Sequence, residues 1–347
     1  MAVFQEGQAA EIDPPEQLIS LAGSPAGVVM HASPSCSKCH KEPSVYFRAY
    51  SGESLCKKCF VQSIEDKAAR SMSKYSMLKK YGERVAIGVS GGKDSLSLLF
   101  VMKRIFESHN RSKDDLIAVT IDEGIKGYRD ESLEIVKNFC SQLGVQSKIV
   151  SYSDLFGVSM DEAMVLRPPE KKMSSCSICG TFRRRAIDLA AESVGADVVA
   201  TAHNMDDQLQ TFMINLLAGD IERIGWIYPE PVEYAGGMKK IKPFVELYEH
   251  EIAFYALQRE IPFQSEECPY MNESIRTDLR EFFNKMEGEH PGIKNNAYAS
   301  MMKVSERLRS SFTGPRGDWK CTLCGRDSTR DVCSVCKTRN LLRPASR

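Results

Sequence analysis

The sequence lacks both a long hydrophobic run and a secretion signal. No window approaches the roughly 18 to 20 consecutive apolar residues that a membrane-spanning helix needs. Residues 1–35 contain no basic start followed by an apolar core, which a signal peptide would have. We therefore expect a soluble cytoplasmic protein without membrane contact. The same residues, with scattered Gly, Ala, Pro and acidic residues, predict a weakly ordered tail.

A net charge is absent as well, since 46 Lys and Arg residues balance 46 Asp and Glu residues. The charges are nevertheless divided along the chain. Residues 36–80 carry 10 basic against 4 acidic residues and residues 313–347 carry 8 against 3, so the middle is acidic. Two basic ends suit a polyanionic substrate, although charged surfaces can also be merely solvated. The length of 347 residues predicts about two domains.

Eight of the 12 cysteines form two four-cysteine patterns. Two Cys-x-x-Cys pairs stand 16 residues apart near the start and 8 apart near the end, spacings typical of zinc modules. Four thiolates close a tetrahedron around Zn2+ and can order a segment too small for its own core. Because both patterns lie in basic stretches, they predict two zinc-held RNA contacts, with architectural zinc as the alternative. The ligands are Cys36, Cys39, Cys56, Cys59, Cys321, Cys324, Cys333 and Cys336.

The four remaining cysteines differ from one another in context. Cys140 lies on the apolar stripe of a predicted helix and is most simply a core residue. Cys176 and Cys179 form a lone Cys-x-x-Cys pair in a predicted loop, and Cys268 could complete it. The pair alone could be a redox dithiol, an incomplete zinc site or part of an iron-sulfur site. Three thiolates on a four-iron cluster would leave one iron open to an outside ligand such as sulfide.

The clearest chemical motif is the segment Ser-Gly-Gly-Lys-Asp-Ser, between a strand pattern at 84–89 and a helix pattern at 96–102. Glycines let the backbone approach an anion, helix-start amides point at it, and the lysine adds positive charge. A Walker loop is excluded because Ile87 and Asp94 stand where it needs other residues, and a dinucleotide fingerprint fails at once after Gly88. The candidate phosphate-binding residues are Ser90, Gly91, Gly92, Lys93, Asp94 and Ser95.

Two further strand patterns, 115–121 and 196–202, end in polar clusters. Helix patterns at 130–143 and 181–194 separate them, which predicts an α/β fold with a parallel sheet that binds ligands at the carboxyl ends of its strands. The polar residues there are Asp122, Gly124, His203, Asp206 and Asp207. With Asp94, the last two are candidate Mg2+ ligands or proton acceptors, whereas His203 is as well explained by capping or packing.

The phosphate loop resembles the SGG-x-DS loop of the N-type ATP pyrophosphatases, the PP-loop superfamily. Together with the zinc patterns, the Cys-x-x-Cys pair and the later cysteine, it resembles the PP-loop tRNA 2-thiolation family over residues 36–336. The resemblance implies an adenylating fold, a homodimer and an oxygen-sensitive iron-sulfur cluster, expected to be a 4Fe-4S cluster, on Cys176, Cys179 and Cys268. The resemblance also implies that residues 90–95 hold the ATP phosphates.

The same resemblance assigns further roles. Asp122 and Gly124 are expected near the adenosine, and Asp206 with Asp207 is expected to serve activation. One departure concerns Arg183. Some related enzymes, which thiolate a uridine in the T-loop of tRNA, carry an essential lysine at this position. An arginine keeps the charge but does not readily release a proton, so a general-base role is weakened.

The implied reaction is ATP-dependent 2-thiolation of a tRNA uridine, at the wobble position. The uridine O2 attacks the α-phosphorus of ATP while Lys93 and Mg2+ neutralise the departing pyrophosphate. Sulfide held by the cluster then attacks C2 and expels AMP. The sulfur donor is open between free sulfide, a persulfide carrier and a ubiquitin-like thiocarboxylate protein.

Alternatives are a 2-thiocytidine synthetase, a lysidine-type ligase and a non-catalytic zinc-ribbon RNA scaffold. After the tail, we expect an N-terminal zinc module, an ATP-binding catalytic domain, a helical extension and a C-terminal zinc ribbon. Their expected ranges are 36–62, 63–240, 241–312 and 313–347. Helix patterns in the later part include 244–258 and 274–286.

Overall fold

The computed structural model describes most of the chain from residue 34 onward. The expected tail lies outside this part except for its last two residues. No helix among the described segments is both long and apolar enough to span a bilayer. The described residues are 34–79, 81–168, 173–231, 238–270, 275–311, 320–328 and 330–342.

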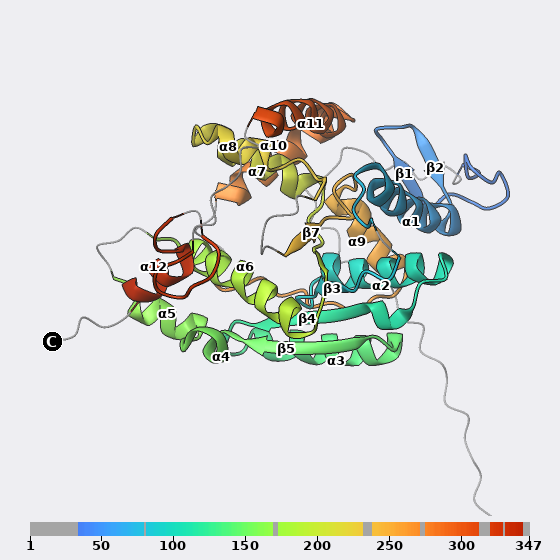
Figure 1. The fold of residues 1–347 in the computed structure, drawn as a ribbon. Coiled ribbons are helices and arrows are strands. Elements are labelled where there is room, and N and C mark those ends of the chain that lie inside the picture. The colour runs from blue at the N-terminus through green and yellow to red at the C-terminus, as the bar shows by residue number, and fades with distance from the viewer. Residues whose placement is uncertain are drawn as a thin grey trace, which may run out of the picture.

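A parallel five-stranded sheet forms the centre of the molecule, as the sequence predicts (Figure 1). Its strand order is β5-β4-β3-β6-β7, and every neighbouring pair is parallel. Two strands had no assignment from the sequence: β5 is largely exposed and polar, and β7 is only three residues long. The strands are β3 (Val85–Gly88), β4 (Leu116–Asp122), β5 (Gln146–Ser151), β6 (Val198–Ala200) and β7 (Lys239–Ile241).

Helices cover both faces of this sheet because successive strand residues point to opposite sides. Val85 and Ile87 join a core cluster that includes side chains of α2 and α3, whereas Ala86 joins a second cluster with α6. The covering helices are α2 (Lys93–Ser108), α3 (Arg129–Leu143), α4 (Tyr152–Phe156), α5 (Met160–Leu166) and α6 (Ser175–Ser193), with the short 3-10 helix η2 (Lys113–Asp115) before β4.

The remaining helices pack at the β6 and β7 side of the sheet and at the two ends of the chain. The predicted helix at 244–258 begins only at Glu249, because Tyr248 caps it and the Glu251 side chain folds back to the Tyr248 N–H. These helices are α1 (Lys57–Lys74), α7 (Met205–Leu217), α8 (Ile221–Gly225), α9 (Glu249–Gln258), α10 (Ile275–Glu289), α11 (Ile293–Ser311) and α12 (Ser334–Leu341).

The prediction that Cys176 and Cys179 lie in a loop is wrong. Both lie in the first turns of α6, which begins at Ser175. The reason is local, since the Ser174 hydroxyl accepts a hydrogen bond from the Ser177 N–H at 3.2 Å and caps the helix. The pair therefore projects from a helix, and Cys179 precedes Arg183 by about one turn.

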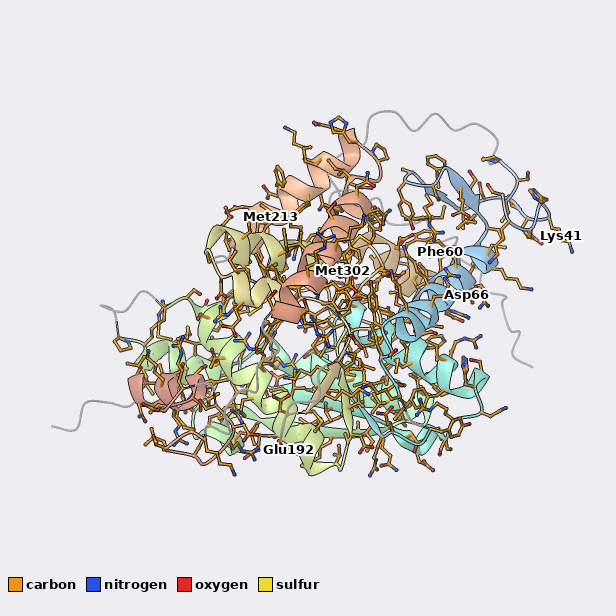
Figure 2. All side chains as sticks on the ribbon, turned by 45° about the horizontal axis from the view of Figure 1, so that its top comes forward. Lys41, Phe60, Asp66, Glu192, Met213 and Met302 are labelled. Atoms are coloured by element: carbon orange, nitrogen blue, oxygen red, sulfur yellow. The ribbon has the colours of Figure 1, made fainter. Side chains whose placement is uncertain are left out.

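The two cysteine-rich ends lie on opposite sides of the molecule. The hairpin of β1 (Tyr46–Arg48) and β2 (Glu53–Leu55) stands beside α1, whereas α12 packs against α6. A second view, in which Lys41 marks the N-terminal end, shows the same separation (Figure 2). Nucleic acid held at both ends would therefore have to cross the whole molecule.

Candidate functional site

Each four-cysteine pattern converges to one cluster with all sulfur atoms within 4.8 Å of one another. The Sγ atoms of Cys39 and Cys56 are 3.8 Å apart, as are those of Cys324 and Cys333. A tetrahedron with zinc-sulfur bonds of about 2.3 Å has edges of about 3.8 Å, so both clusters fit a tetrathiolate metal. The Cys333 N–H, with further backbone donors, lowers the pKa of the Cys321 thiol to about 6, which favours the ligating thiolate.

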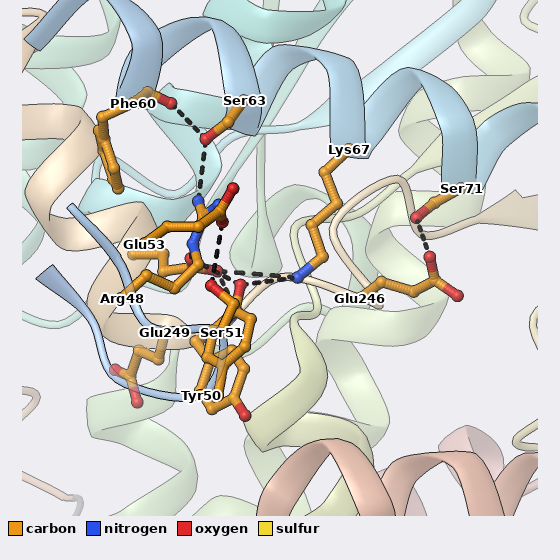
Figure 3. Close-up of polar contacts among 12 residues, drawn as sticks. Arg48, Tyr50, Ser51, Glu53, Phe60, Ser63, Lys67, Ser71, Glu246 and Glu249 are labelled. Atoms are coloured by element: carbon orange, nitrogen blue, oxygen red, sulfur yellow. Dashed lines mark hydrogen bonds and ion pairs between the residues drawn. The ribbon is translucent and has the colours of Figure 1, made fainter. Parts of the chain in front are cut away.

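The N-terminal cluster is joined to the catalytic body by a buried ionic network (Figure 3). Arg48 Nε contacts the fully buried Glu251 carboxylate at 2.8 Å, and Tyr50 and Lys67 approach the same carboxylate at 3.0 and 3.9 Å. Lys74 pairs with Glu246 in the same region. Several cations of this basic stretch are thus neutralised within the protein, which leaves fewer of them for RNA.

The phosphate loop has the conformation that its glycines allow. Gly91 has φ +89°, and a Cβ atom there would lie 2.7 Å from the Ser132 Cβ. The Ser90 N–H donates to Ser95 Oγ at 3.0 Å, and Ser95 Oγ donates to the Gly92 carbonyl at 3.0 Å. Gly92 caps α2, so the first amides of this helix are free to bind an anion.

Lys93 and Asp94 follow the loop and meet a residue that the sequence analysis missed. Lys93 Nζ lies 2.9 Å from a Glu249 carboxylate oxygen and 3.4 Å from an Asp94 oxygen. Burial raises the pKa of Asp94 to about 7, with Glu249 and Asp207 acting in the same direction and Lys93 opposing them. Two carboxylates beside one lysine, with Asp207 near enough to act on Asp94, suit a site that receives both phosphate and Mg2+. No local signal marks Glu249, which lies 156 residues from Lys93.

The aspartate pair after β6 divides into two environments. Asp206 is buried, forms an ion pair with the buried Lys294 of α11, and accepts the Glu249 N–H at 2.8 Å. Asp207 is less buried, and its side chain caps α7 by accepting the Asn204 N–H at 3.1 Å. Burial raises the pKa of Asp207, and the nearby Glu249 adds to this. Both oxygens of Asp206 are thus engaged within the protein, whereas Asp207 faces the other carboxylates.

His203 and the β4 residues lie at the same edge of the sheet, because β4, β3 and β6 are adjacent and parallel. His203 Nδ1 lies 2.9 Å from the Thr201 hydroxyl. The Asp122 carboxylate accepts the Gly124 N–H at 2.9 Å. Gly124 has φ +70°, and a Cβ atom there would lie 2.7 Å from the Ser159 Cβ. These contacts hold the loop after β4 close to the start of α5.

Cys176 and Cys179 of α6 and Cys268, which follows α9, lie near one another. Cys176 Sγ lies 3.8 Å from the Tyr270 carbonyl oxygen, and the Ser175 hydroxyl donates to the same oxygen at 2.9 Å, which holds the Cys268 loop against α6. Burial raises the pKa of Cys268, and the nearby Cys179 and Cys176 add to this. Among the described residues these thiols do not converge within 4.8 Å, as a single metal ion would require. Wider spacing fits a cluster in which each thiolate binds a different iron.

A chain of charged groups connects the phosphate loop to these thiols. Arg129 donates to the Ser90 carbonyl at 2.8 Å and to the Ile121 carbonyl at 2.7 Å. Its Nε lies 2.7 Å from one oxygen of the buried Glu123, whose other oxygen lies 3.0 Å from Arg183. Arg183 in turn donates to Cys179 Sγ at 3.3 Å. The sequence analysis assigned no role to Glu123, although this residue stands between two predicted site residues. It assigned none to Arg129 either.

The chain is similar to known proteins over most of its length. Residues 62–287 match the family model of the PP-loop domain, and residues 35–61 match that of the 2-thiouridine synthetase TtuA N-terminal LIM domain. A cytoplasmic tRNA 2-thiolation protein 1 from Aspergillus niger is 37% identical over 307 residues, which cover 87% of this chain and 86% of the relative. The tRNA 2-thiolation protein NcsA of Haloferax volcanii is 32% identical, over 87% and 97% of the two chains.

A solved structure agrees with the sequence relatives. The U34-tRNA thiolase NcsA from Methanococcus maripaludis, solved with its 4Fe-4S cluster, is 30% identical with a TM-score of 0.76, over 91% of this chain and 99% of that one. The sequence and fold of the whole catalytic body are therefore shared. This chain belongs to the PP-loop tRNA 2-thiolation protein family.

Proposed function

We propose that this protein is a cytoplasmic enzyme that uses ATP to replace O2 of a tRNA uridine by sulfur, at the wobble position. The observation that carries the proposal is the charged chain from the Ser90 carbonyl through Arg129, Glu123 and Arg183 to Cys179. It ties an ATP-binding loop and a set of thiols into one site. The names of the relatives, which state tRNA 2-thiolation, support the same reaction.

In the activation step, the uridine O2 attacks the α-phosphorus of ATP. The new oxygen-phosphorus bond forms as the bond to pyrophosphate breaks, and the pyrophosphate leaves with the electron pair. The amides at the start of α2 and Lys93 stabilise that negative charge. Asp94 and Asp207 are the proposed Mg2+ ligands. Asp206, neutralised by Lys294, positions the start of α9 and with it Glu249.

In the sulfur step, Cys176, Cys179 and Cys268 would hold the iron-sulfur cluster. When bound there, a 4Fe-4S cluster supplies an iron that is open to an outside sulfur ligand. Attack of sulfide on C2 of the adenylated uridine forms the carbon-sulfur bond, and AMP departs with the electrons of the carbon-oxygen bond. Arg183 is proposed to orient Cys179 and to offset its negative charge rather than to accept a proton.

Further parts of the proposal concern assembly and partners. The four-cysteine clusters hold structural metal, for which Zn2+ is proposed at both ends. The enzyme acts as a homodimer and receives sulfur as free sulfide or from a persulfide or thiocarboxylate carrier protein. The proposed domain limits are those expected from the sequence.

The direct test is nucleoside mass spectrometry. Protein reconstituted with iron and sulfide under anaerobic conditions is incubated with Mg-ATP, sulfide and unmodified tRNA, and the RNA is digested. The expected product is 2-thiouridine that depends on ATP and appears with equimolar pyrophosphate. Thiocytidine would assign the protein to the sister activity, and a lack of tRNA-dependent pyrophosphate release would favour the scaffold alternative.

Matched variants separate the two steps. Lys93→Met should reduce pyrophosphate release by about 100-fold or more, whereas Lys103→Met, at a half-buried lysine further along the same helix, should leave it unchanged. Cys268→Ser should lose the cluster absorption and the thiolation but retain ATP binding. Cys140→Ala, which changes a buried cysteine of α3, serves as its control. If Cys268→Ser keeps both cluster and product, the three-thiol assignment is wrong.

A further inference from the structure

A group of cations surrounds His203 at the edge of the sheet where β6 and β7 end. It comprises Arg184 of α6, Lys240 of β7, Lys242 directly after β7, and Arg276 of α10. We call these four residues the rim cations. They come from separate elements, and no sequence motif marks them as a set. They are also distinct from the basic stretches of the two cysteine-rich ends.

Neutral oxygens hold two of the rim cations in place. Arg276 donates to the Thr211 hydroxyl at 3.0 Å and contacts the Gln210 side-chain oxygen at 3.4 Å. Lys242 contacts the Gln208 side-chain oxygen at 3.4 Å. These acceptors all belong to α7, and they orient the cations without neutralising them. Such positioning lowers the conformational entropy that binding an anion would cost.

Two carboxylates act on this group: Asp188 forms an ion pair with Lys240, and Asp207 attracts Lys242 and Arg276 without an ion pair to Lys242. Lys240 pairs with Asp188 at 2.8 Å, but Arg184 and Lys242 form no ion pair with any residue in the described part of the chain. Partial desolvation, together with Lys242, Arg276, Lys240 and Arg184, lowers the pKa of His203, so its ring is neutral at pH 7. Burial also lowers the pKa of Arg184, and the adjacent Arg223 and Arg276 add to this. The cations therefore repel one another in the absence of an anion.

Proteins gather cations where a polyanion binds, because the anion relieves their mutual repulsion. The N-terminal basic stretch differs, since Arg48, Lys67 and Lys74 are paired with Glu251 and Glu246. Lys242 follows β7 and His203 follows β6, which is the neighbour of β3 and its phosphate loop, so RNA held by the rim cations would reach the nucleotide site.

We propose that the rim cations bind phosphodiester groups of the substrate RNA and thereby place the target uridine at the phosphate loop. Arg184 and Lys242 supply charge that forms no ion pair within the described part of the chain, and Arg276 completes the surface. This inference rests on the proposed function, in that the polyanion is taken to be tRNA. It assigns RNA positioning to the catalytic rim rather than to the metal-bound ends.

The experiment compares two double variants that each remove two positive charges. Arg184→Gln/Lys242→Gln alters the rim, and Lys57→Gln/Lys58→Gln alters exposed lysines of α1 beside the N-terminal metal cluster. Binding of an unmodified tRNA transcript is measured at several salt concentrations. We expect the rim variant to raise the Kd about tenfold and to reduce the slope of log Kd against log salt by about 0.7 to 0.9 for each cation removed.

The α1 variant should change the tRNA Kd less than twofold. ATP affinity, measured in parallel, should be unchanged in the rim variant. This result would show that the rim cations bind RNA phosphates and not the ATP triphosphate. Circular dichroism verifies that each variant is folded. Equal losses in both doubles, a loss in the α1 double alone, or a loss of ATP affinity instead would overturn the inference. Wild-type protein that binds tRNA at the rim yet releases no pyrophosphate would contradict the proposed function and leave the RNA site standing.

Discussion

At the residue scale, Gly91 determines the shape of the phosphate loop. Its φ of +89° strains any other residue, and a Cβ atom would lie 2.7 Å from the Ser132 Cβ and 3.0 Å from the Ser132 carbonyl oxygen. Backbone strain of about 1 to 2 kcal/mol and overpacking of about 1 to 3 kcal/mol act together. Gly91→Ala should therefore lower the free energy of unfolding by about 3 kcal/mol and abolish ATP binding, as urea unfolding and calorimetric titration would measure.

Gly52 provides the control for this substitution. It has φ +70°, but a Cβ atom there would meet no other atom within 4 Å. Gly52→Ala isolates the backbone strain and should cost about 1 to 2 kcal/mol without affecting ATP binding. Equal destabilisation by the two variants would contradict the packing argument for Gly91.

Asp94 predicts a pH dependence of stability. Burial raises the pKa of its carboxyl group to about 7 in the folded protein, whereas an unfolded aspartate titrates near about 4. The folded state thus holds the proton more tightly, so this contribution to stability is complete below about pH 4 and is lost as the pH rises to about 7.

Asp94→Asn removes the ionisation while it keeps the shape of the side chain. Without bound nucleotide, the variant should melt at a higher temperature than wild type at pH 8, and the difference should shrink at pH 5. Thermal unfolding at the two pH values measures this. A difference that stays constant with pH would show that the carboxylate is not destabilised by its surroundings.

At the scale of elements, Glu123 links three of them. It follows β4 and pairs with Arg129 at the start of α3 and with Arg183 of α6. The side chains of Glu123 and Arg129 are 4% and 5% exposed, so removing the Glu123 charge leaves Arg129 buried without an ion-pair partner among the described residues. Glu123→Gln should lower the free energy of unfolding by about 3 kcal/mol, measured by urea unfolding.

An exposed pair in α2 serves as the comparison. Glu107 pairs with Lys103 one turn away, and its side chain is 50% exposed. Because water screens such pairs, Glu107→Gln should cost less than about 0.5 kcal/mol. If both substitutions cost the same small amount, the buried chain between the phosphate loop and the thiols has no structural role.

At the scale of the whole molecule, the two cysteine clusters should differ in their effect on stability. Leu55, Phe60 and Ile64 of the N-terminal end belong to the main hydrophobic core, and Arg48 is buried against Glu251. The C-terminal cluster is attached by the exposed pair of Arg326 and Glu192 and by the buried Leu342.

Loss of the N-terminal metal should therefore disturb the catalytic body more. Cys59→Ser should lower the main melting temperature and the affinity for ATP. Cys324→Ser should have a smaller effect on both quantities. Calorimetry combined with metal analysis, which should show one equivalent of metal lost in each variant, measures the effect. A larger drop for Cys324→Ser would reverse this assignment.

Much of this architecture could be predicted from the sequence because its signals are local. The phosphate loop is six contiguous residues whose amides and glycines set their own geometry. The four-cysteine spacings satisfy tetrahedral coordination within short segments. Alternating strand and helix patterns predict the parallel sheet, and its topology gathers the strand ends at one edge.

Where local sequence signals are weak, the secondary structure was predicted wrongly or not at all. The first turns of α6 were assigned to a loop because serine and cysteine do not form an apolar pattern, yet a serine cap begins the helix there. The strand β5 is polar because it lies at the edge of the sheet, and an edge strand has little burial to mark it.

The sequence by itself determined the phosphate-loop motif, the two four-cysteine patterns and the family. Only the tertiary structure decided which charges meet: Lys93 with Glu249, Asp206 with Lys294, and Glu123 with Arg129 and Arg183. A motif of neighbouring residues is constrained by its own backbone, and this constraint produces a recognisable pattern in the sequence. A buried ion pair joins side chains that only packing brings together, and ionic attraction imposes no spacing along the chain.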